Sequence, residues 1–251
     1  MLTNEVKKYT AVVTGGTRGI GRAVCLDLSK HFCSTIFANY LQNDEEARIT
    51  KSLLEAQCCS AHIIKRNLSN PDEIDKMFDE IYSKTHEIDI LVHCAAINTF
   101  KPLIDIRPNQ WDLIMNANAR SFLHCVQKCL PIMNEGKIVA LSSLGSRVYL
   151  PNYGAMSPTK SALESVVRVL AVELADKGIR VNGVTAGFVK TDSLSKFPSS
   201  DKLIASAIER TPSKRIGNVQ DISNAVMFLI SHLADWIYGQ NIVVDGGISI
   251  C

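Results

Sequence analysis

The sequence predicts an α/β fold in which one doubly wound parallel sheet carries helices on both faces. Three observations support this prediction. Short apolar runs alternate with longer amphipathic segments along the whole chain, as they do where helices cross over between parallel strands. The runs at 88–93 and 137–142 are apolar at mostly consecutive positions, which is typical of strands covered on both faces. The first run passes directly into a glycine-rich turn and a helical pattern, as in nucleotide-binding units.

Each strand is predicted from a short aliphatic or β-branched run, and each helix from apolar residues that recur at helical spacing. The predicted strands are 11–14, 35–39, 61–65, 88–93, 137–141, 180–184 and 241–244. The predicted helices are 19–31, 44–57, 71–84, 109–130, 158–177 and 220–232. The helix at 158–177 should begin after Ser157, an N-cap residue, with Pro158 at its first position.

Residues 190–218 interrupt the alternation with a long excursion between a strand and a helix. We expect this segment to form a substrate lid at the carboxyl edge of the sheet, where doubly wound folds bind ligands. The alternative is a surface insertion without function. Because no linker, repeat or low-complexity segment is evident, we expect one domain over 1–251.

Composition excludes several classes of partner. The 27 basic and 25 acidic residues are interspersed and give a net charge of +2, so we expect neither nucleic acid nor a membrane as a partner. The eight cysteines form no Cys-x-x-Cys pair and no zinc-site spacing, so we expect free thiols and no metal. The N-terminus lacks an apolar signal core and no run of 18 apolar residues occurs, which favours a cytoplasmic protein.

The turn after the first strand reads Thr-Gly-Gly-Thr-Arg-Gly-Ile-Gly over 14–21. Glycine permits a tight turn and lets backbone N–H groups approach a pyrophosphate, which the positive end of the helix dipole stabilises. Taken alone, the pattern also fits a tight strand-to-helix turn that binds nothing.

The Gly-x-x-x-Gly-x-Gly spacing of Gly15, Gly19 and Gly21 resembles the short-chain dehydrogenase/reductase family, and the resemblance extends over essentially the whole chain. It implies a Rossmann-like fold, a nicotinamide dinucleotide cofactor and, from the segment 239–247, a homotetramer. The cofactor-binding residues that it implies are Gly15, Thr17, Arg18, Gly19, Ile20, Gly21, Asn39, Tyr40, Asn67, Leu68, Cys94, Ala95, Ala96, Tyr153, Lys160, Gly187, Val189 and Thr191.

The end of the second strand predicts which dinucleotide binds. NAD-binding units place an acidic residue about 20 positions after the glycines, where it holds the ribose hydroxyls. Here that position falls on Asn39 and Tyr40, and Asp44 comes past the end of the strand. Arg18 lies in the turn itself, and a guanidinium group suits a phosphate. We therefore expect NADPH, with NADH as the less favoured cofactor.

The family's catalytic signature is Tyr-x-x-x-Lys, in which the Tyr donates a proton while the Lys binds ribose and makes the phenol a better acid. Lys160 matches the Lys, but Met156 occupies the Tyr position and the nearest tyrosine is Tyr153. This Tyr-x6-Lys spacing resembles the enoyl-[acyl-carrier-protein] reductases, most closely their NADPH-dependent FabL type. The resemblance implies Tyr153, Lys160, Ser143 and Asn118 as the catalytic residues.

Two other side chains are weaker candidates for catalysis. His93 could act as a general base, but it ends a buried strand at a position that is structural in the family, so we expect it to be structural here. Tyr149 is a lesser candidate for a second proton donor.

We therefore expect NADPH-dependent reduction of the trans-2 double bond of an enoyl thioester, on acyl carrier protein or CoA, in fatty-acid or related synthesis. Charge then develops on a thioester oxygen that lies farther from the nicotinamide than a ketone oxygen would, so the donor must lie farther out. Two alternatives stay open: a carbonyl reductase acting on a 3-oxoacyl thioester or another ketone or alcohol, which Ser143 favours, and a cofactor-binding protein without turnover.

Basic residues in or beside the lid suit docking of an acidic carrier protein, namely Lys190, Lys196, Lys202, Arg210, Lys214 and Arg215.

Overall fold

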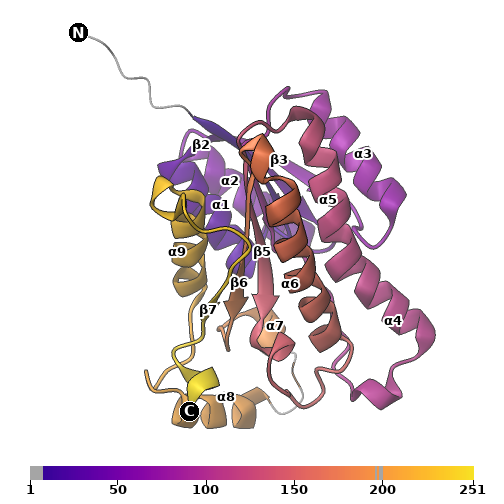
Figure 1. Cartoon of the computed structure of the whole chain (residues 1–251), viewed down its shortest axis with the longest axis vertical. Coiled ribbons are helices and arrows are strands. Elements are labelled where there is room, and N and C mark those ends of the chain that lie inside the picture. The colour runs from indigo at the N-terminus through magenta and orange to yellow at the C-terminus, as the bar shows by residue number, and fades with distance from the viewer. Residues whose placement is uncertain (1–7, 196, 198–199) are drawn as a thin grey trace.

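In the computed structural model, which describes residues 8–195, 197 and 200–251, the chain forms a seven-stranded parallel sheet with helices on both faces (Figure 1). The strands are β1 (Tyr9–Thr14), β2 (Cys33–Tyr40), β3 (Ser60–Lys65), β4 (Ile90–His93), β5 (Lys137–Ser143), β6 (Arg180–Ala186) and β7 (Asn241–Val244). Their order in the sheet is β3-β2-β1-β4-β5-β6-β7, and every neighbouring pair is parallel. The predicted fold class is confirmed.

Successive side chains of each strand enter two different cores, because strand residues point alternately to opposite faces. In β1, Val12 packs into one core and its neighbours Ala11 and Val13 pack into the other. The Val12 side of the sheet is covered by α3 (Pro71–Tyr82), α5 (Ser121–Cys129) and α6 (Met156–Glu173), and the other side by α1 (Gly19–His31), α2 (Asp44–Glu55) and α9 (Val219–Ile230). A further helix, α4 (Pro108–Met115), precedes α5 and contacts α6.

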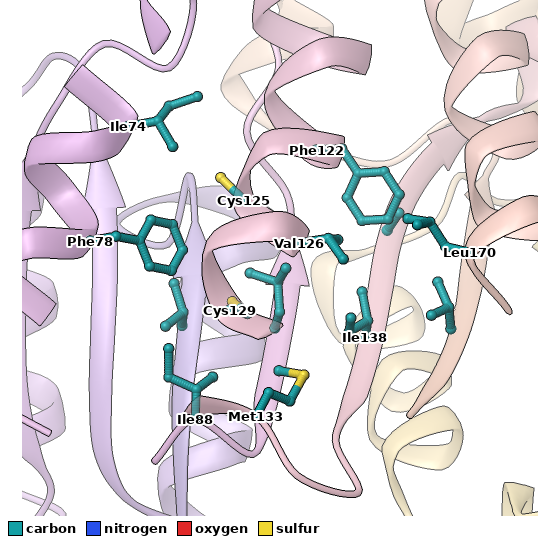
Figure 2. Packing of buried hydrophobic residues seen from close by; sticks show 14 of the residues in the cluster. Ile74, Phe78, Ile88, Phe122, Cys125, Val126, Cys129, Met133, Ile138 and Leu170 are labelled. Carbon is teal, nitrogen blue, oxygen red and sulfur yellow. The ribbon is translucent and has the colours of Figure 1, made fainter. Parts of the chain in front are cut away.

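The core under α3 and α5 is built from aromatic, aliphatic and sulfur-bearing side chains (Figure 2). Phe78 of α3 and Phe122 of α5 are fully buried, and Cys125 and Cys129 of α5 belong to the same buried cluster. All eight cysteines are free thiols, and the buried ones pack as small hydrophobic side chains.

The predicted helix at 109–130 is interrupted where the chain passes the carboxyl edge of the sheet. A π-helical turn, η2 (Asn116–Arg120), separates α4 from α5. A π turn inserts one extra residue into the helix and is frequent at functional sites. Here it carries Asn118 inward, where that side chain is completely buried.

The predicted start of α6 is wrong by two residues. The helix begins at Met156 rather than at Pro158, and Ser157 is inside the helix rather than its N-cap. Pro158 is accommodated because the first-turn N–H groups of a helix lack intrahelical acceptors in any case. Tyr153 therefore lies in the turn that precedes α6, and its carbonyl oxygen accepts a hydrogen bond of 3.0 Å from the N–H of Ser157.

The segment predicted as a lid contains two helices, α7 (Asp192–Ser195) and α8 (Ser200–Arg210), which lie at the carboxyl end of the sheet (Figure 1). Its ends are tied together, since the N–H of Lys190 donates to the carbonyl of Gly217. A small apolar cluster of Leu144, Ala207 and Ile248 packs α8 against the C-terminal turn.

Two negative findings hold for the part of the chain that the structure describes. None of its helices combines the length and the hydropathy needed to cross a bilayer. It also contains no group of three or more His, Cys, Asp or Glu side chains arranged to hold a metal ion.

Candidate active site

Two adjoining cavities open at the carboxyl edge of the sheet, as doubly wound topology requires of a ligand site. The first, of about 310 Å³, lies beyond the ends of β1, β2 and β3, and the second, of about 420 Å³, lies between the ends of β5 and β6 and the lid. They share a wall that includes Arg18 and Ile20 of the glycine turn and Cys94 after β4. A ligand long enough to span both cavities would therefore pass over this shared wall.

The glycine turn at the base of the first cavity tolerates no side chain at its crowded positions. Gly19 has a φ of +52°, in the left-handed region, and a Cβ added at Gly21 would lie 2.0 Å from the carbonyl oxygen of Gly15. The carbonyl of Thr17 accepts hydrogen bonds from the Arg22 guanidinium and from the Thr50 hydroxyl, which fixes the turn from behind. The turn is thus a rigid cradle at the N-terminus of α1, suited to an anionic group.

The far end of the first cavity is framed by the ends of β2 and β3. Asn39 is buried, and its side-chain amide donates to the carbonyls of Ile64 at 3.3 Å and Arg66 at 3.1 Å. It therefore braces the two strand ends with its N–H₂ group. Asn67 and Leu68 line the cavity just beyond β3.

Asp44, the acidic residue that follows β2 in the sequence, is already hydrogen-bonded to neighbouring side chains. Asp44 accepts hydrogen bonds of 2.8 Å from both the Tyr40 hydroxyl and the Lys65 ammonium, and these partners hold the pKa of Asp44 below its usual value. Two guanidinium groups, those of Arg18 and Arg66, line the cavity instead. Charge at this end thus favours a phosphate over bare ribose hydroxyls.

The two arginines differ in how they are held. Arg66 lies near two carboxylates, with its Nη2 3.4 Å from Glu80 and its Nε 3.8 Å from Glu73. Arg18 is exposed, and within the described parts of the chain no hydrogen bond or ion pair engages its guanidinium. Arg18 is therefore the better placed of the two to bind a ligand anion.

The second cavity holds the tyrosine that the spacing singled out. The Tyr153 hydroxyl donates to the Ser143 Oγ at 3.0 Å, so the structure brings these two residues together from the turn before α6 and the end of β5. A Cβ at Gly145 would lie 2.4 Å from the Tyr153 ring, so glycine there leaves room for the phenol. Burial raises the pKa of Tyr153, and the phenol is protonated at neutral pH.

Two phenylalanines, Phe100 and Phe197, close over this tyrosine. The Phe197 ring is stacked on the Tyr153 ring with centroids 6.0 Å apart, and its centroid is 4.5 Å from that of Phe100. All three line the second cavity, together with Leu150 and Phe188. The wall around the phenol is therefore mostly apolar and fits a hydrocarbon chain better than a charged group.

Lys160 lies one helical turn into α6 and is almost completely buried. Its ammonium donates a hydrogen bond of 2.6 Å to the carbonyl of Leu141 on β5. Burial lowers its pKa to about 8, while negative charge on Cys94 or Glu164 would raise that pKa. Both Lys160 and Tyr153 line the second cavity, but in the described structure they do not hydrogen-bond to each other.

Asn118 lies outside the walls of both cavities. Its carboxamide accepts from the N–H of Ile97 and donates to the carbonyl of Ile97, and its N–H₂ group also contacts Met156 and Thr159. The expected catalytic Asn is therefore used to fix the loop after β4 against the start of α6. Its direct part in the reaction stays a prediction.

His93 is fully buried between Thr14 of β1 and Ser121 of α5, and its ring nitrogens lie 3.0 Å and 3.3 Å from their hydroxyls. Burial lowers the pKa of His93 to about 3. It lines neither cavity, in line with the expectation of a structural residue. Tyr149 is 86% exposed and also lies outside both cavity walls.

All other predicted site residues line at least one of the two cavities, although their roles stay predictions. Those in the wall of the first cavity are Gly15, Thr17, Arg18, Gly19, Ile20, Gly21, Asn39, Tyr40, Asn67, Leu68, Cys94, Ala95, Ala96 and Thr191. Those in the wall of the second include Ser143, Tyr153, Lys160, Gly187 and Val189.

Sequence reasoning missed Arg66 and Phe100. Arg66 immediately follows β3, so a second cation beyond the predicted strand 61–65 was a usable signal. Phe100 stands in an irregular loop and carries no pattern that points to the cavity. Only the fold places it against Phe197, from a segment almost 100 residues away.

Comparison with known proteins agrees with this geometry. The model of a family described as enoyl-(acyl carrier protein) reductase matches residues 15–249. The chain is 34% identical over 247 residues to a 1-cyclohexenylcarbonyl-CoA reductase of Streptomyces collinus, covering 97% of this chain and 88% of the relative. It is 32% identical over 241 residues to the 3-oxoacyl-[acyl-carrier-protein] reductase FabG of Staphylococcus epidermidis, covering 95% and 98%.

Solved structures give the same likeness. A short-chain dehydrogenase from Burkholderia cenocepacia in complex with NADP superposes with a TM-score of 0.90 at 26% identity, covering 98% of this chain and 100% of that one. The angucycline C-6 ketoreductase LanV with bound NADP gives a TM-score of 0.89 at 27% identity, covering 97% and 96%.

The buried His93 predicts a loss of stability in mild acid. Its folded-state pKa of about 3 lies below the unfolded value of 6.5, so the unfolded state binds more protons in this window and stability falls as pH drops below 6.5. We expect this residue to cost about 2 kcal/mol at pH 5 relative to pH 7. Urea denaturation at both pH values measures the loss, and His93→Gln should flatten the dependence. The exposed His232→Gln is the control, and equal pH dependence in the native and H93Q proteins would contradict the account.

Proposed function

The chain belongs to the short-chain dehydrogenase/reductase family, and from that premise we propose that it reduces the trans-2 double bond of an enoyl thioester with NADPH. As a member of this family it is an NAD(P)-dependent oxidoreductase. The finer assignment concerns which bond is reduced, since relatives include both a cyclohexenylcarbonyl-CoA reductase and 3-oxoacyl reductases.

The position of the acidic tyrosine carries the proposal. Met156, one turn before Lys160, can donate no proton, and the phenol comes from Tyr153 in the preceding turn. Reduction of an enoyl thioester places the hydride on Cβ, so negative charge develops on the thioester oxygen, farther out than the oxygen of a ketone at the hydride acceptor. The enolate then takes a proton from solvent at Cα, which gives the saturated thioester. A donor set back from the usual position matches that oxygen.

The chemistry of this donor follows from its surroundings. Because Tyr153 stays protonated, it acts as a neutral hydrogen-bond donor to the developing enolate oxygen. The Tyr153 hydroxyl donates to the Ser143 Oγ, 3.0 Å from its own oxygen, and both hydroxyls can turn toward one substrate oxygen in the cavity. The apolar wall formed with Phe100 and Phe197 limits the water that would otherwise compete for that oxygen.

We infer that NADPH spans the two cavities. Its pyrophosphate would lie on the glycine turn, its 2′-phosphate near Arg18 and Arg66, and its nicotinamide between Cys94 and Val189. When bound, NADPH supplies the hydride. A Cβ at Gly19 would lie 3.7 Å from a Thr191 methyl, so turn and lid face each other across this path.

One observation favours carbonyl reduction as a second candidate. A tyrosine and a serine hydroxyl 3.0 Å apart form a pair of donors that also suits a single ketone oxygen. The FabG relative acts on a 3-oxoacyl thioester, which would fit the same apolar cavity. The likeness to the FabL type of enoyl reductase stays a prediction.

We propose an acyl carrier protein as the partner that presents the thioester. Lys190 and Lys202 are exposed at the lid, and none of their contacts within the described residues engages the ammonium group. Lys214 and Arg215 are used locally, by the carbonyl of Glu209 and by Asp221. Lys196, also expected at this rim, lies outside the described residues.

The homotetramer also remains a proposal. Exposed apolar side chains on α6, Val169 and Val172, and after α9, Trp236, offer surface of the kind that subunit interfaces cover.

Removing the Tyr153 hydroxyl should abolish most turnover. We expect Tyr153→Phe to lower kcat with crotonyl-CoA and NADPH by roughly 10²–10³-fold, the usual loss when one oxyanion donor is removed. The Kd of NADPH, from its fluorescence, should change far less than kcat, because Phe keeps the ring and Lys160 and the glycine turn are unchanged. Tyr149→Phe, at an exposed position, is the matched control. A Y153F enzyme with native kcat would refute the proposed mechanism.

Arg18 should select the phosphorylated cofactor. Arg18→Ala removes a charged donor near the 2′-phosphate, so the Kd of NADPH should rise roughly tenfold or more while that of NADH stays unchanged. Titration of each cofactor by fluorescence measures both constants. Arg48→Ala, whose guanidinium pairs with Glu45 on the surface of α2, is the control. Equal weakening for both cofactors would remove the phosphate role.

Lys202 tests carrier docking. Because surface charge acts on a charged partner and little on a small thioester, Lys202→Ala should raise the KM for crotonyl-acyl carrier protein more than that for crotonyl-CoA. The difference should shrink at high salt. Equal KM changes for both thioesters would exclude Lys202 from docking.

A further inference from the structure

A buried carboxylate lies beneath the second cavity and has no place in the chemistry described so far. Glu164 is one turn beyond Lys160 on α6, and its side chain is 9% exposed. Its Oε1 accepts hydrogen bonds from three hydroxyls, those of Ser142 at 2.6 Å, Ser146 at 2.6 Å and Thr185 at 2.9 Å. A carboxylate taken out of water and given three donors on one oxygen is a built arrangement.

The three hydroxyls come from the segments that form the floor of the cavity. Ser142 and Thr185 are paired across β5 and β6. Each immediately precedes a residue in the cavity wall, Ser143 and Ala186 respectively. Ser146 belongs to the short turn after β5, and its Oγ also lies 2.8 Å from the carbonyl oxygen of Ser143. Glu164 thus joins α6 to both strand ends that carry the site.

We propose that Glu164 is a positioning residue for the reductase site: its three hydroxyl contacts fix the strand ends that bear Ser143 and Ala186, and its negative charge one helical turn away helps keep Lys160 protonated. The inference rests on the proposed function only in assigning Ser143 and Lys160 their roles. The contacts themselves concern the protein without substrate.

The charge part of the proposal depends on what faces Lys160. Three elements place groups near Lys160. Glu164 comes from α6, His93 and Cys94 come from the end of β4, and the carbonyl of Leu141 comes from β5. His93 is neutral and the thiol of Cys94 is protonated, because burial raises its pKa to about 12. Glu164 is then the anionic group that opposes the burial of the ammonium. Arg147, 3.7 Å from its other oxygen, is 43% exposed and screened by water.

Two variants separate the effect of the length of the Glu164 side chain from the effect of its charge. Glu164→Gln keeps the length of the side chain and an oxygen acceptor but removes the charge. Glu164→Asp keeps the charge but is one methylene shorter, so it loses hydroxyl contacts. Glu173→Gln, on the exposed surface at the end of the same helix, is the matched control.

The first measurement needs no turnover. NMR of the cofactor-free protein with ¹³C-labelled lysine follows the titration of Lys160, whose signal is identified by its absence in Lys160→Arg. We expect a midpoint near 8 in the native, E164D and E173Q proteins and a clearly lower midpoint in E164Q, since loss of a nearby negative charge disfavours the ammonium. An unchanged midpoint in E164Q would overturn the charge role, and a purely structural Glu164 would give that result.

The second measurement tests positioning with whichever thioester the native enzyme reduces. We expect E164D to lower kcat by roughly tenfold with the KM of NADPH near native, because the donors to the substrate oxygen lose alignment. Native kcat in E164D would overturn the positioning role. If the native protein reduced neither an enoyl nor a keto thioester, the proposed function would fail, while the lysine titration would still decide the inference about Glu164.

Discussion

The hydrogen bond from the Ser157 N–H to the carbonyl of Tyr153 ties the backbone of Tyr153 to the first turn of α6, and the position of its side chain in the second cavity depends on it. With the helix beginning at Met156, the side chain one turn before Lys160 is a thioether packed against Asn118. The phenol that lines the cavity is instead that of Tyr153, which enters from the preceding turn. Pro158 is compatible with this start, because it lies in the first turn of α6, where the N–H groups have no intrahelical acceptors.

Around that turn the structure combines a neutral acid with a buried cation. Tyr153 is held by Ser143, and Lys160 by the carbonyl of Leu141, so the two groups are fixed separately. In the signature shared by the family, the lysine charge makes the phenol a better acid. Here burial raises the pKa of Tyr153 and lowers the pKa of Lys160. Burial, and not the other residue of the pair, is the main cause of each shift. A neutral donor suits stabilisation of an enolate, which needs a hydrogen bond rather than a full proton transfer to oxygen.

Much of this could be predicted from the sequence because it depends on local pattern. The parallel strands follow from consecutive apolar residues, and the first cavity follows from glycines that no other residue could replace, such as Gly21. The start of α6 was misplaced because Ser157 and Pro158 form a good N-cap pair locally, whereas the helix begins at Met156, whose sulfur contacts Asn118. The π turn at Asn118 was also missed, since its sequence continues the helical pattern.

Features made by distant segments lay beyond sequence reasoning. Phe100 and Phe197 meet across the cavity, and the hydroxyls of Ser142 and Thr185 converge on Glu164 from different strands. Spacing along the chain carries no record of such contacts. The place of Arg18 in the wall of the first cavity, in contrast, was predictable because this residue stands inside a recognisable turn, while its phosphate-binding role stays a prediction.

The central claim is that the set-back phenol serves an enoyl thioester. Following NADPH absorbance with crotonyl-CoA and then with acetoacetyl-CoA under the same conditions tests it most directly. The account predicts oxidation of NADPH with crotonyl-CoA and a much lower kcat/KM with acetoacetyl-CoA. Oxidation with acetoacetyl-CoA alone would contradict it and would make the protein a carbonyl reductase with a displaced tyrosine.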